Sequence, residues 1–227
     1  MLSNFVLEAF GTSRCDPETL LGSDAEMRLA PIQTARMELA MTSLNEFIFV
    51  AGGMDASDTP LSSVSKYSLE TNTWTEVKEM NEARRTHELV TLNGEIYAIG
   101  GNETNTVECY NPSTNEWRFV TPTKNQSDCS GAVSYLNKIY VLNRNGFEVF
   151  DPQSKTWQDL PELNIGYGAK LVPMNDKLWA VGGGKDYENY ITASKTVYEF
   201  DINNNSWRKL LEMDVARILH QAVVVNL

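Results

Sequence analysis

The chain repeats a fixed pair of aromatic residues four times, and this repeat restricts its fold more than any other feature. In each copy a tryptophan follows another aromatic residue by seven positions. The pairs are Tyr67 and Trp74, Tyr110 and Trp117, Phe150 and Trp157, and Phe200 and Trp207. Since a fixed spacing that recurs along a chain is typical of repeat architectures, we expect one stacked structure built from similar units.

A further aromatic position lies upstream of each pair, within the segments FIFVAGG, EIYAIGG, KIYVLNR and KLWAVGG. In three of these segments two glycines follow the aromatic residue: Gly52 and Gly53, Gly100 and Gly101, and Gly182 and Gly183. From the tryptophan of one unit to the first aromatic residue of the following unit, the interval is 23, 23 and 22 residues. Within a unit, the interval from this first aromatic residue to the aromatic residue of the pair varies from 10 to 21. The constant interval indicates scaffold, and the variable one indicates a surface loop.

The local pattern within a unit is that of short β-strands. In the third unit, apolar-rich runs such as KIYVLN and TWQDL are separated by Asn, Gly and Asp-Pro turn signals. No segment has an apolar period of 3.6 residues over a helical length. Four short strands in roughly 45 residues are typical of one β-propeller blade, which must stack on its neighbours to bury its faces. We therefore expect an all-β propeller with the aromatic pairs between blades.

The segments VECYNP and NEW, with an arginine thirteen residues before the aromatic-x-x-Gly-Gly pattern, resemble the kelch motif over nearly the whole chain. The N-terminal segment looks like strands two to four of a blade, with Met27 at the tryptophan position, and RILHQAVVVNL looks like a first strand. Pairing the two ends would close the ring and remove exposed sheet edges. Such a composite blade resembles the Kelch domain of the BTB-Kelch (kelch-like) proteins.

We expect about five four-stranded blades, although six are usual in that family, in one domain over residues 1–227. The expected boundaries are 1–35 for strands two to four of the composite blade, 36–79, 80–122, 123–162 and 163–212 for the four complete blades, and 213–227 for the closing strand.

Charge and cysteine content narrow the classes of partner and compartment. Thirty acidic and 19 basic residues leave a net charge of −11, which argues against binding nucleic acid or an anionic membrane. Three scattered cysteines fit a reducing compartment. The N-terminus has no basic region before its short apolar run, and no apolar stretch approaches the roughly 20 residues that span a bilayer. We expect a soluble cytoplasmic protein.

The sequence contains little that suggests catalysis. The two histidines, His87 and His220, each follow an arginine by three positions, and a metal site needs three or four ligands. No P-loop, GxSxG or HExxH motif is present. We expect no enzyme activity, no metal, no catalytic residue and no cofactor. The resemblance leaves a catalytic propeller of the galactose oxidase or sialic acid epimerase type as the least favoured alternative.

The resemblance implies a shallow bowl that grips partner peptides, formed by the ends of first strands and the loops between second and third strands. The arginine position of the motif holds Arg36 and Arg84, with Arg217 in the C-terminal strand, and arginine suits bidentate contact with carboxylate or phosphate. Structural bonding to a neighbouring blade is the alternative role. Further expected contacts, before third strands or in the polar loop Lys185–Lys195, are Ser63, Thr106, Thr196, Tyr187 and Tyr190.

By resemblance, the chain is the substrate-recognition part of a BTB-Kelch adaptor for a cullin-RING ubiquitin ligase. The BTB and BACK domains that bind the cullin are absent from these residues, so we do not expect this chain alone to bind cullin. The alternative is an actin-binding scaffold of the cytoskeleton.

Overall fold

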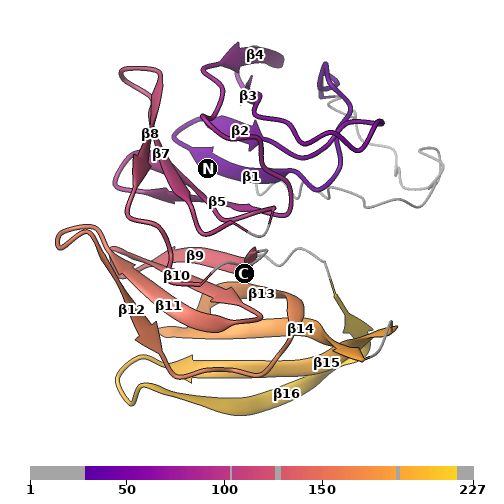
Figure 1. Ribbon diagram of the computed structural model, residues 1–227, viewed down its shortest axis with the longest axis vertical. Helices are drawn as coiled ribbons and strands as arrows, with labels where there is room; N and C mark the ends of the chain where they lie inside the picture. Colours follow the sequence, from indigo (N-terminus) through magenta and orange to yellow (C-terminus); the bar gives the residue numbers. More distant parts are fainter. Residues whose placement is uncertain (1–28, 103, 126–128, 188–189, 219–227) are drawn as a thin grey trace.

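The computed structural model describes residues 29–102, 104–125, 129–187 and 190–218. These residues form four antiparallel sheets of four strands, and in each sheet the strands lie side by side in chain order. Figure 1 shows the sheets following one another in an arc, from β1–β4 at the top to β13–β16 at the bottom. The described part of the chain contains no helix that could cross a membrane.

The first sheet contains β1 (Ala40–Leu44), β2 (Phe47–Ala51), β3 (Val64–Ser68) and β4 (Thr73–Val77). The second contains β5 (Glu88–Leu92), β6 (Glu95–Ile99), β7 (Val107–Asn111) and β8 (Glu116–Val120). The third contains β9 (Cys129–Tyr135), β10 (Lys138–Asn143), β11 (Gly146–Asp151) and β12 (Thr156–Leu160). The fourth contains β13 (Tyr167–Met174), β14 (Lys177–Tyr187), β15 (Tyr190–Asp201) and β16 (Ser206–Arg217).

The first strand of each sheet lies innermost, where β1, β5, β9 and β13 contact one another in turn (Figure 1). At Gly131 on β9 the backbone of β13 comes so close that a Cβ would lie 2.7 Å from the amide nitrogen of Leu171. Across this point Lys170 on β13 forms an ion pair with Glu88 on β5. The innermost layer therefore ties the second sheet to the fourth.

The seven-residue spacing of the aromatic pairs is a cross-strand pairing. Tyr67 on β3 is the register partner of Trp74 on β4, and their ring centroids are 5.0 Å apart. The other three pairs have the same register and centroid distances of 5.0 or 5.1 Å. Since both residues must face each other across a hairpin of constant length, their separation in sequence cannot change.

Three apolar clusters lie between adjacent sheets and form the core. In the first, Phe49 of β2 contacts Tyr110 of the second sheet, with ring centroids 5.9 Å apart. In the next, Tyr97 contacts Phe150 of the third sheet at 6.1 Å. Each of the first three sheets thus buries one face against the aromatic pair of the sheet that follows it.

Each repeat tryptophan also anchors the segment that leads into its own sheet. The indole nitrogen of Trp117 donates a hydrogen bond to the carbonyl oxygen of Lys78 at 2.9 Å, and that of Trp74 donates to Ala30 at 2.8 Å. Trp157 and Trp207 donate to Thr121 and Pro161 in the same way, each at 2.9 Å. Ala30 therefore holds, before the first sheet, the place that Lys78 holds before the second. Met27, expected just upstream, lies outside the described residues.

The structure corrects the expected number of blades, because the described residues form four sheets rather than about five. Most of the expected composite blade, 1–28 and 219–227, lies outside the described residues. Residues 213–217 do not start a first strand but continue β16, where Arg217 pairs with Ser194 of β15. Because β15 is long, its outer part has backbone N–H and C=O groups that need hydrogen-bond partners, and β16 continues alongside to pair with it.

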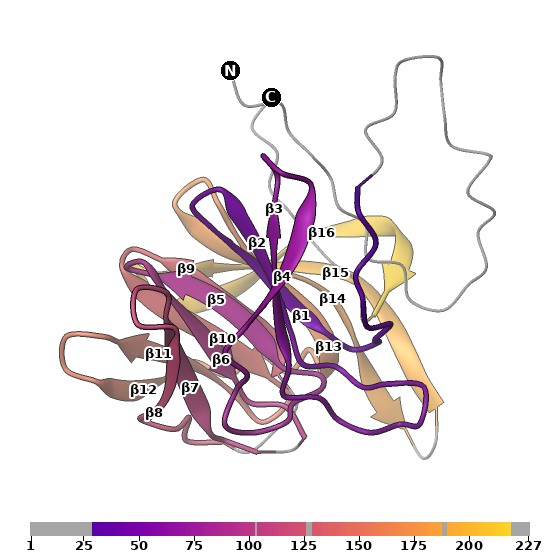
Figure 2. The same cartoon turned by 90° about the horizontal axis from the view of Figure 1, so that it is seen from above.

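The polar segment Lys185–Lys195, expected to be a loop, is instead mostly the outer part of the β14–β15 hairpin. The two strands pair as far as Tyr187 and Tyr190, with a register shift between Val181 and Gly184. Tyrosine, isoleucine and threonine favour extended structure, which extends the strands beyond the blade. In Figures 1 and 2 this hairpin and the β2–β3 connection reach the same side of the molecule.

His87 is buried, at 4% exposure, between two of the glycine pairs. A Cβ on Gly52 would lie 2.7 Å from its Cε1, and a Cβ on Gly101 would lie 2.8 Å from its Cβ. Neither ring nitrogen has a hydrogen-bond partner among the described residues. Burial lowers the pKa of His87 to about 3, and the nearby positive charges of Arg84 and Lys170 add to this. His87 is thus a neutral packing residue, and His220 lies outside the described residues.

Two glycines with positive φ, one packed closely against another backbone segment and one in open space, separate the effect of close packing from that of backbone strain. Gly101 has φ of +89°, and a Cβ there would lie 2.6 Å from the carbonyl oxygen of Arg85; Gly94 has φ of +79° with nothing within 4 Å. We expect Gly94→Ala to lower the free energy of unfolding by about 1 kcal/mol through backbone strain, and Gly101→Ala by about 2–3 kcal/mol more. Urea denaturation measures both. Equal losses would contradict the role of the close approach.

The buried His87 predicts a loss of stability in acid. Its folded-state pKa lies below the unfolded value, so the unfolded chain binds the extra proton and stability falls as the pH drops from about 6.5 towards 3. Between pH 7.5 and 5 we expect the wild type to lose about 2 kcal/mol more than His87→Leu, which cannot titrate. Urea denaturation at each pH provides the comparison, and parallel curves would rule out this explanation.

Candidate functional site

Arg36 and Arg84 make the same backbone contacts in successive sheets. The Nη1 atom of Arg84 donates to the carbonyl oxygens of Gly100 and Thr106, at 2.7 and 3.0 Å. The Nη1 atom of Arg36 donates to the equivalent oxygens of Gly52 and Ser63, at 3.2 and 3.1 Å. Each arginine therefore holds together the end of a second strand and the start of a third.

Arg84 is fully buried beside an equally buried carboxylate. Its Nη2 atom lies 3.1 Å from Oε1 of Glu108 and 3.0 Å from Oε2 of Glu82, and the side chains of Arg84 and Glu108 are both 0% exposed. A charge in such a position requires a paired and hydrogen-bonded partner, which Glu108 supplies. Full burial leaves Arg84 no surface for a partner protein, which corrects the prediction that it contacts one. Its side-chain bonds lie within its own repeat unit, whereas its backbone bonds to Gly53 and Leu61 of the preceding unit.

Arg36 lacks this carboxylate, because Ser65 stands where the second sheet has Glu108. The Ser65 hydroxyl is used by Glu76, to whose carboxylate it donates at 2.7 Å. Arg36 is half-buried, and its Nη2 atom is buried without a hydrogen-bond partner among the described residues. Desolvation lowers the pKa of Arg36, and the charge of Glu76 opposes this. Arg36 therefore retains hydrogen-bonding capacity that Arg84 uses internally.

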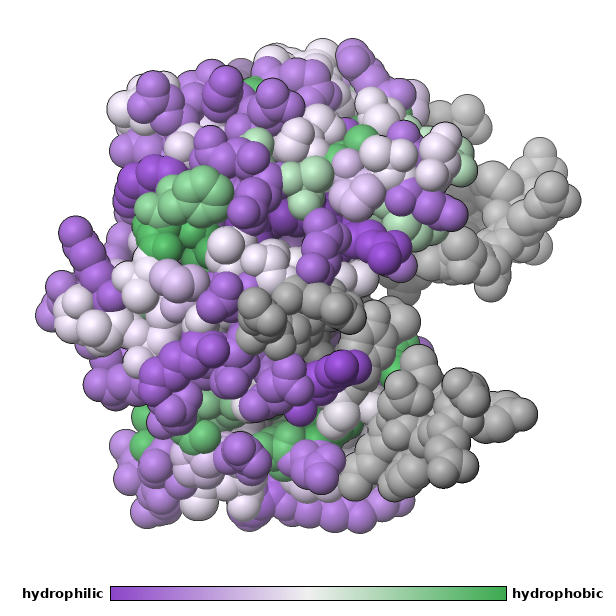
Figure 3. Space-filling view, in the orientation of Figure 1, coloured by the Kyte–Doolittle hydropathy of each residue, from purple (hydrophilic) through white to green (hydrophobic). Residues whose placement is uncertain are grey.

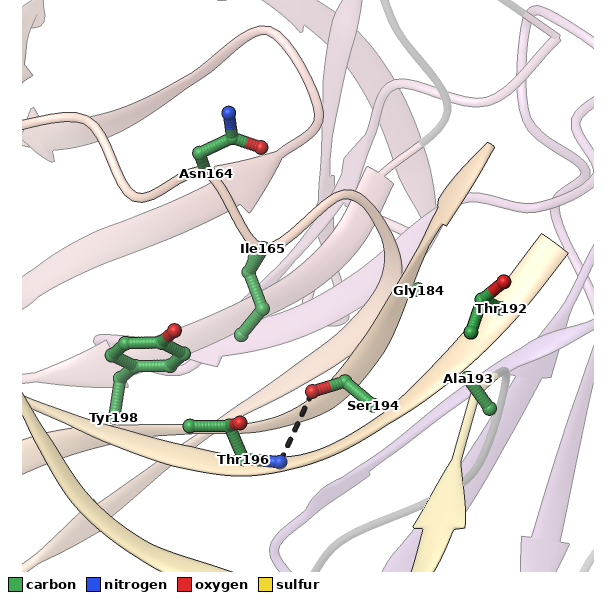
Figure 4. A pocket seen from close by; sticks show the side chains of 8 residues that line it. All are labelled: Asn164, Ile165, Gly184, Thr192, Ala193, Ser194, Thr196 and Tyr198. Atoms are coloured by element: carbon green, nitrogen blue, oxygen red, sulfur yellow. Dashed lines mark hydrogen bonds between the residues drawn. The ribbon is translucent and has the colours of Figure 1, made fainter. Parts of the chain in front are cut away.

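A pocket of about 310 Å³ lies between β15 and the segment that leads into β13. Figure 4 shows its lining: Asn164, Ile165, Gly184, Thr192, Ala193, Ser194, Thr196 and Tyr198. The amide N–H of Thr196 donates to the Ser194 hydroxyl at 3.0 Å. The polar side chains are uncharged hydroxyls and one amide, which can donate to and accept from a peptide backbone.

Thr196 is the sequence-predicted residue that the structure places in this pocket. It lies within β15, not directly before a third strand, because the hairpin is longer than expected. Sequence reasoning missed Thr192, Ser194 and Tyr198. These residues lie on the same strand as Thr196, but the register shifts between Ser194 and Thr196 and between Val197 and Tyr198, so strand alternation alone would not have placed all four on one face.

The other predicted contact residues are distributed differently. Ser63 directly precedes β3, and its carbonyl oxygen accepts from Arg36. The Thr106 hydroxyl accepts from Arg84 and donates to Glu82, so its hydrogen bonds lie inside the second unit. Tyr187 and Tyr190 are register partners at the end of the β14–β15 hairpin. Ser63 and Thr106 thus each contact the arginine of their own unit, whereas Arg217 lies on the outermost strand of the fourth sheet.

Among the described residues, no group of three His, Cys, Asp or Glu side chains could hold a metal ion. Cys109 is fully buried on β7, and burial raises the pKa of its thiol to about 12. A thiol with this pKa is protonated at neutral pH and is a poor nucleophile.

Comparison with known proteins identifies related sequences over most of the chain. Kelch repeat and BTB domain-containing protein 8 of Danio rerio is 28% identical over 194 residues, which are 78% of this chain and 31% of that protein. Kelch-like protein 35 of Mus musculus is 28% identical over 192 residues, again 78% and 31%. Beta-scruin of Limulus polyphemus is 28% identical over 185 residues, 71% and 20%. The chain thus spans a third or less of these relatives.

A solved structure, that of YjhT, superposes with a TM-score of 0.70 and 17% identity, covering 84% of this chain and 75% of that one. This likeness concerns the fold alone. The family model of the Attractin/LZTR1 beta-propeller matches residues 48–227. Since this match covers most of the chain and the matched region forms stacked four-stranded sheets, the chain belongs to the Attractin/LZTR1 beta-propeller family and is a kelch-type propeller.

Proposed function

We propose that this propeller is a protein-interaction module that binds a peptide or protein partner on the side carrying the β14–β15 hairpin. The hydroxyl-lined pocket on β15 carries the proposal. Thr192, Ser194, Thr196 and Tyr198 present hydrogen-bonding groups without charge, and such groups suit the backbone and polar side chains of a peptide. Tyr187 and Tyr190 at the hairpin tip extend the proposed surface.

Arg36 is the second part of the proposed surface. It is half-buried, and unlike Arg84 it forms no ion pair with the described residues, so its positive charge can attract a carboxylate of the partner, although its unpartnered Nη2 atom is itself buried. Ser63, whose carbonyl oxygen Arg36 contacts at 3.1 Å, lies beside it. The first unit has lost the internal acid that neutralises the equivalent arginine in the second.

We propose further that the module works without enzyme activity, in the cytoplasm, as the substrate-recognition part of a cullin-RING ubiquitin ligase adaptor. Kelch repeat and BTB domain-containing protein 8 supports this role by its domain content. Binding to the cullin would need BTB and BACK domains outside these residues. Actin binding by a scaffold propeller is the alternative, and co-sedimentation with F-actin separates it from the adaptor role.

The pocket proposal predicts that two hydroxyl deletions weaken partner capture without unfolding the chain. Thr196→Val and Tyr198→Phe each remove one hydroxyl from the pocket, and we expect each to reduce partner affinity about tenfold. Affinity purification with the whole chain, followed by quantitative mass spectrometry, measures the proteins retained. Thr75→Val, at an exposed position on β4, is the matched control. Equal recovery with all variants would exclude this pocket as the partner site.

A further inference from the structure

A second and larger pocket lies between the second and third sheets, at the ends opposite the connections between second and third strands. It has a volume of about 660 Å³, within the range of roughly 300–1,000 Å³ of known ligand pockets. Residues from β6, β8, β11 and the β11–β12 turn line it, among them Glu95, Arg118, Phe119, Phe150, Pro152 and Lys155. None of these was considered a binding residue from the sequence.

The position of Phe119 is unusual within the repeat. Two residues after the tryptophan, the other three sheets have Glu76, Asp159 and Lys209, all of them charged. In the second sheet this position is Phe119, which is 53% exposed. An apolar patch is visible on the second sheet where it adjoins the third (Figure 3). Because the scaffold accepts a charge here in every other sheet, stacking of the sheets does not explain this phenylalanine.

A fixed ion pair at the same place also departs from the repeat. Arg118 donates to both carboxylate oxygens of Glu95, at 2.7 and 2.9 Å, and the Arg118 side chain remains 51% exposed. The equivalent positions in the third sheet are Gln158 and Lys138, which cannot form this pair. Bidentate pairing holds a guanidinium in one orientation. Arg118 is thus a positioned cation at the edge of the pocket.

Lys155 adds a second positive charge on the opposite wall. It occupies the β11–β12 turn with φ of 57°, is exposed, and forms no ion pair with the described residues. The nearby acids are already occupied, since Asp151 pairs with Lys138 and Asp159 with Lys124. In a chain of net charge −11, this pocket therefore combines an exposed aromatic ring with the Arg118–Glu95 ion pair and one further cation, Lys155.

We propose that this pocket is a second binding site, which takes a peptide segment of a partner protein with an acidic residue next to a large apolar one. The apolar side chain packs on Phe119, and the carboxylate pairs with Lys155 and the exposed edge of Arg118. Half of Phe119 faces solvent, so the pocket is open at the surface and admits a side chain carried by an extended chain. The site is independent of the hydroxyl-lined pocket.

The test uses the whole chain and three blocked peptides followed by amide chemical shifts. The probe is acetyl-Asp-Leu-Trp-amide, and the controls are acetyl-Asn-Leu-Trp-amide, which lacks the charge, and acetyl-Asp-Gly-Gly-amide, which lacks the apolar part. We expect shifts at Phe119 and Lys155, and an affinity at least about threefold weaker for each control peptide. Absence of shifts, or equal affinity for all three peptides, would overturn the proposal. So would equally tight binding of indole-3-acetate, which would identify a small-molecule site.

Two variants place the binding at the named residues. Phe119→Asp introduces the residue type that the third sheet already carries at this position, so the fold is expected to tolerate it, and Lys155→Gln removes the charge. We expect Phe119→Asp to reduce the affinity for the Asp-Leu-Trp peptide about tenfold, and Lys155→Gln to reduce it about threefold. Lys78→Gln, an exposed lysine elsewhere, and Thr196→Val in the other pocket should leave affinity unchanged. Unchanged binding in Phe119→Asp, with the native thermal transition retained, would refute the site.

Discussion

Aromatic packing between adjacent sheets is the interaction on which this structure depends. A four-stranded sheet of five-residue strands cannot bury its own faces, so each must be covered by a neighbour. The Trp117 ring covers the first sheet, and its indole nitrogen holds the carbonyl oxygen of Lys78 in the connecting segment. One side chain therefore determines both the spacing of the sheets and the path of the chain between them.

The positions outside this aromatic packing differ from sheet to sheet, and the residues of both proposed binding sites are among them. Arg84 and Glu108 satisfy each other inside the second unit, whereas Arg36 faces Ser65 in the first and keeps an unused donor. Phe119 replaces a charged residue on the outer surface of the second sheet. Comparison of equivalent positions in the four sheets therefore separates residues that the packing requires from residues that it does not.

The sequence predicts features that depend on local spacing, but it does not predict the length of a hairpin or the burial of a side chain. The seven-residue interval of Tyr67 and Trp74 follows from a hairpin and could be interpreted directly. The length of the β14–β15 hairpin could not, because a polar segment rich in tyrosine and threonine suits a loop as well as an extended strand. Consequently Thr196 was identified without the hydroxyl row around it, and residues 213–217 were assigned to a closing strand instead of β16.

The sequence by itself determined the all-β repeat and the cross-strand aromatic pairs, since these depend on contacts between residues close in the chain. Only the tertiary structure decided how many sheets the described residues form, that Arg84 is buried, and that Phe119 and Lys155 face one pocket. Those properties depend on which surfaces meet between sheets. Residues 36 apart in sequence, such as these two, become neighbours only when one blade stacks on the next.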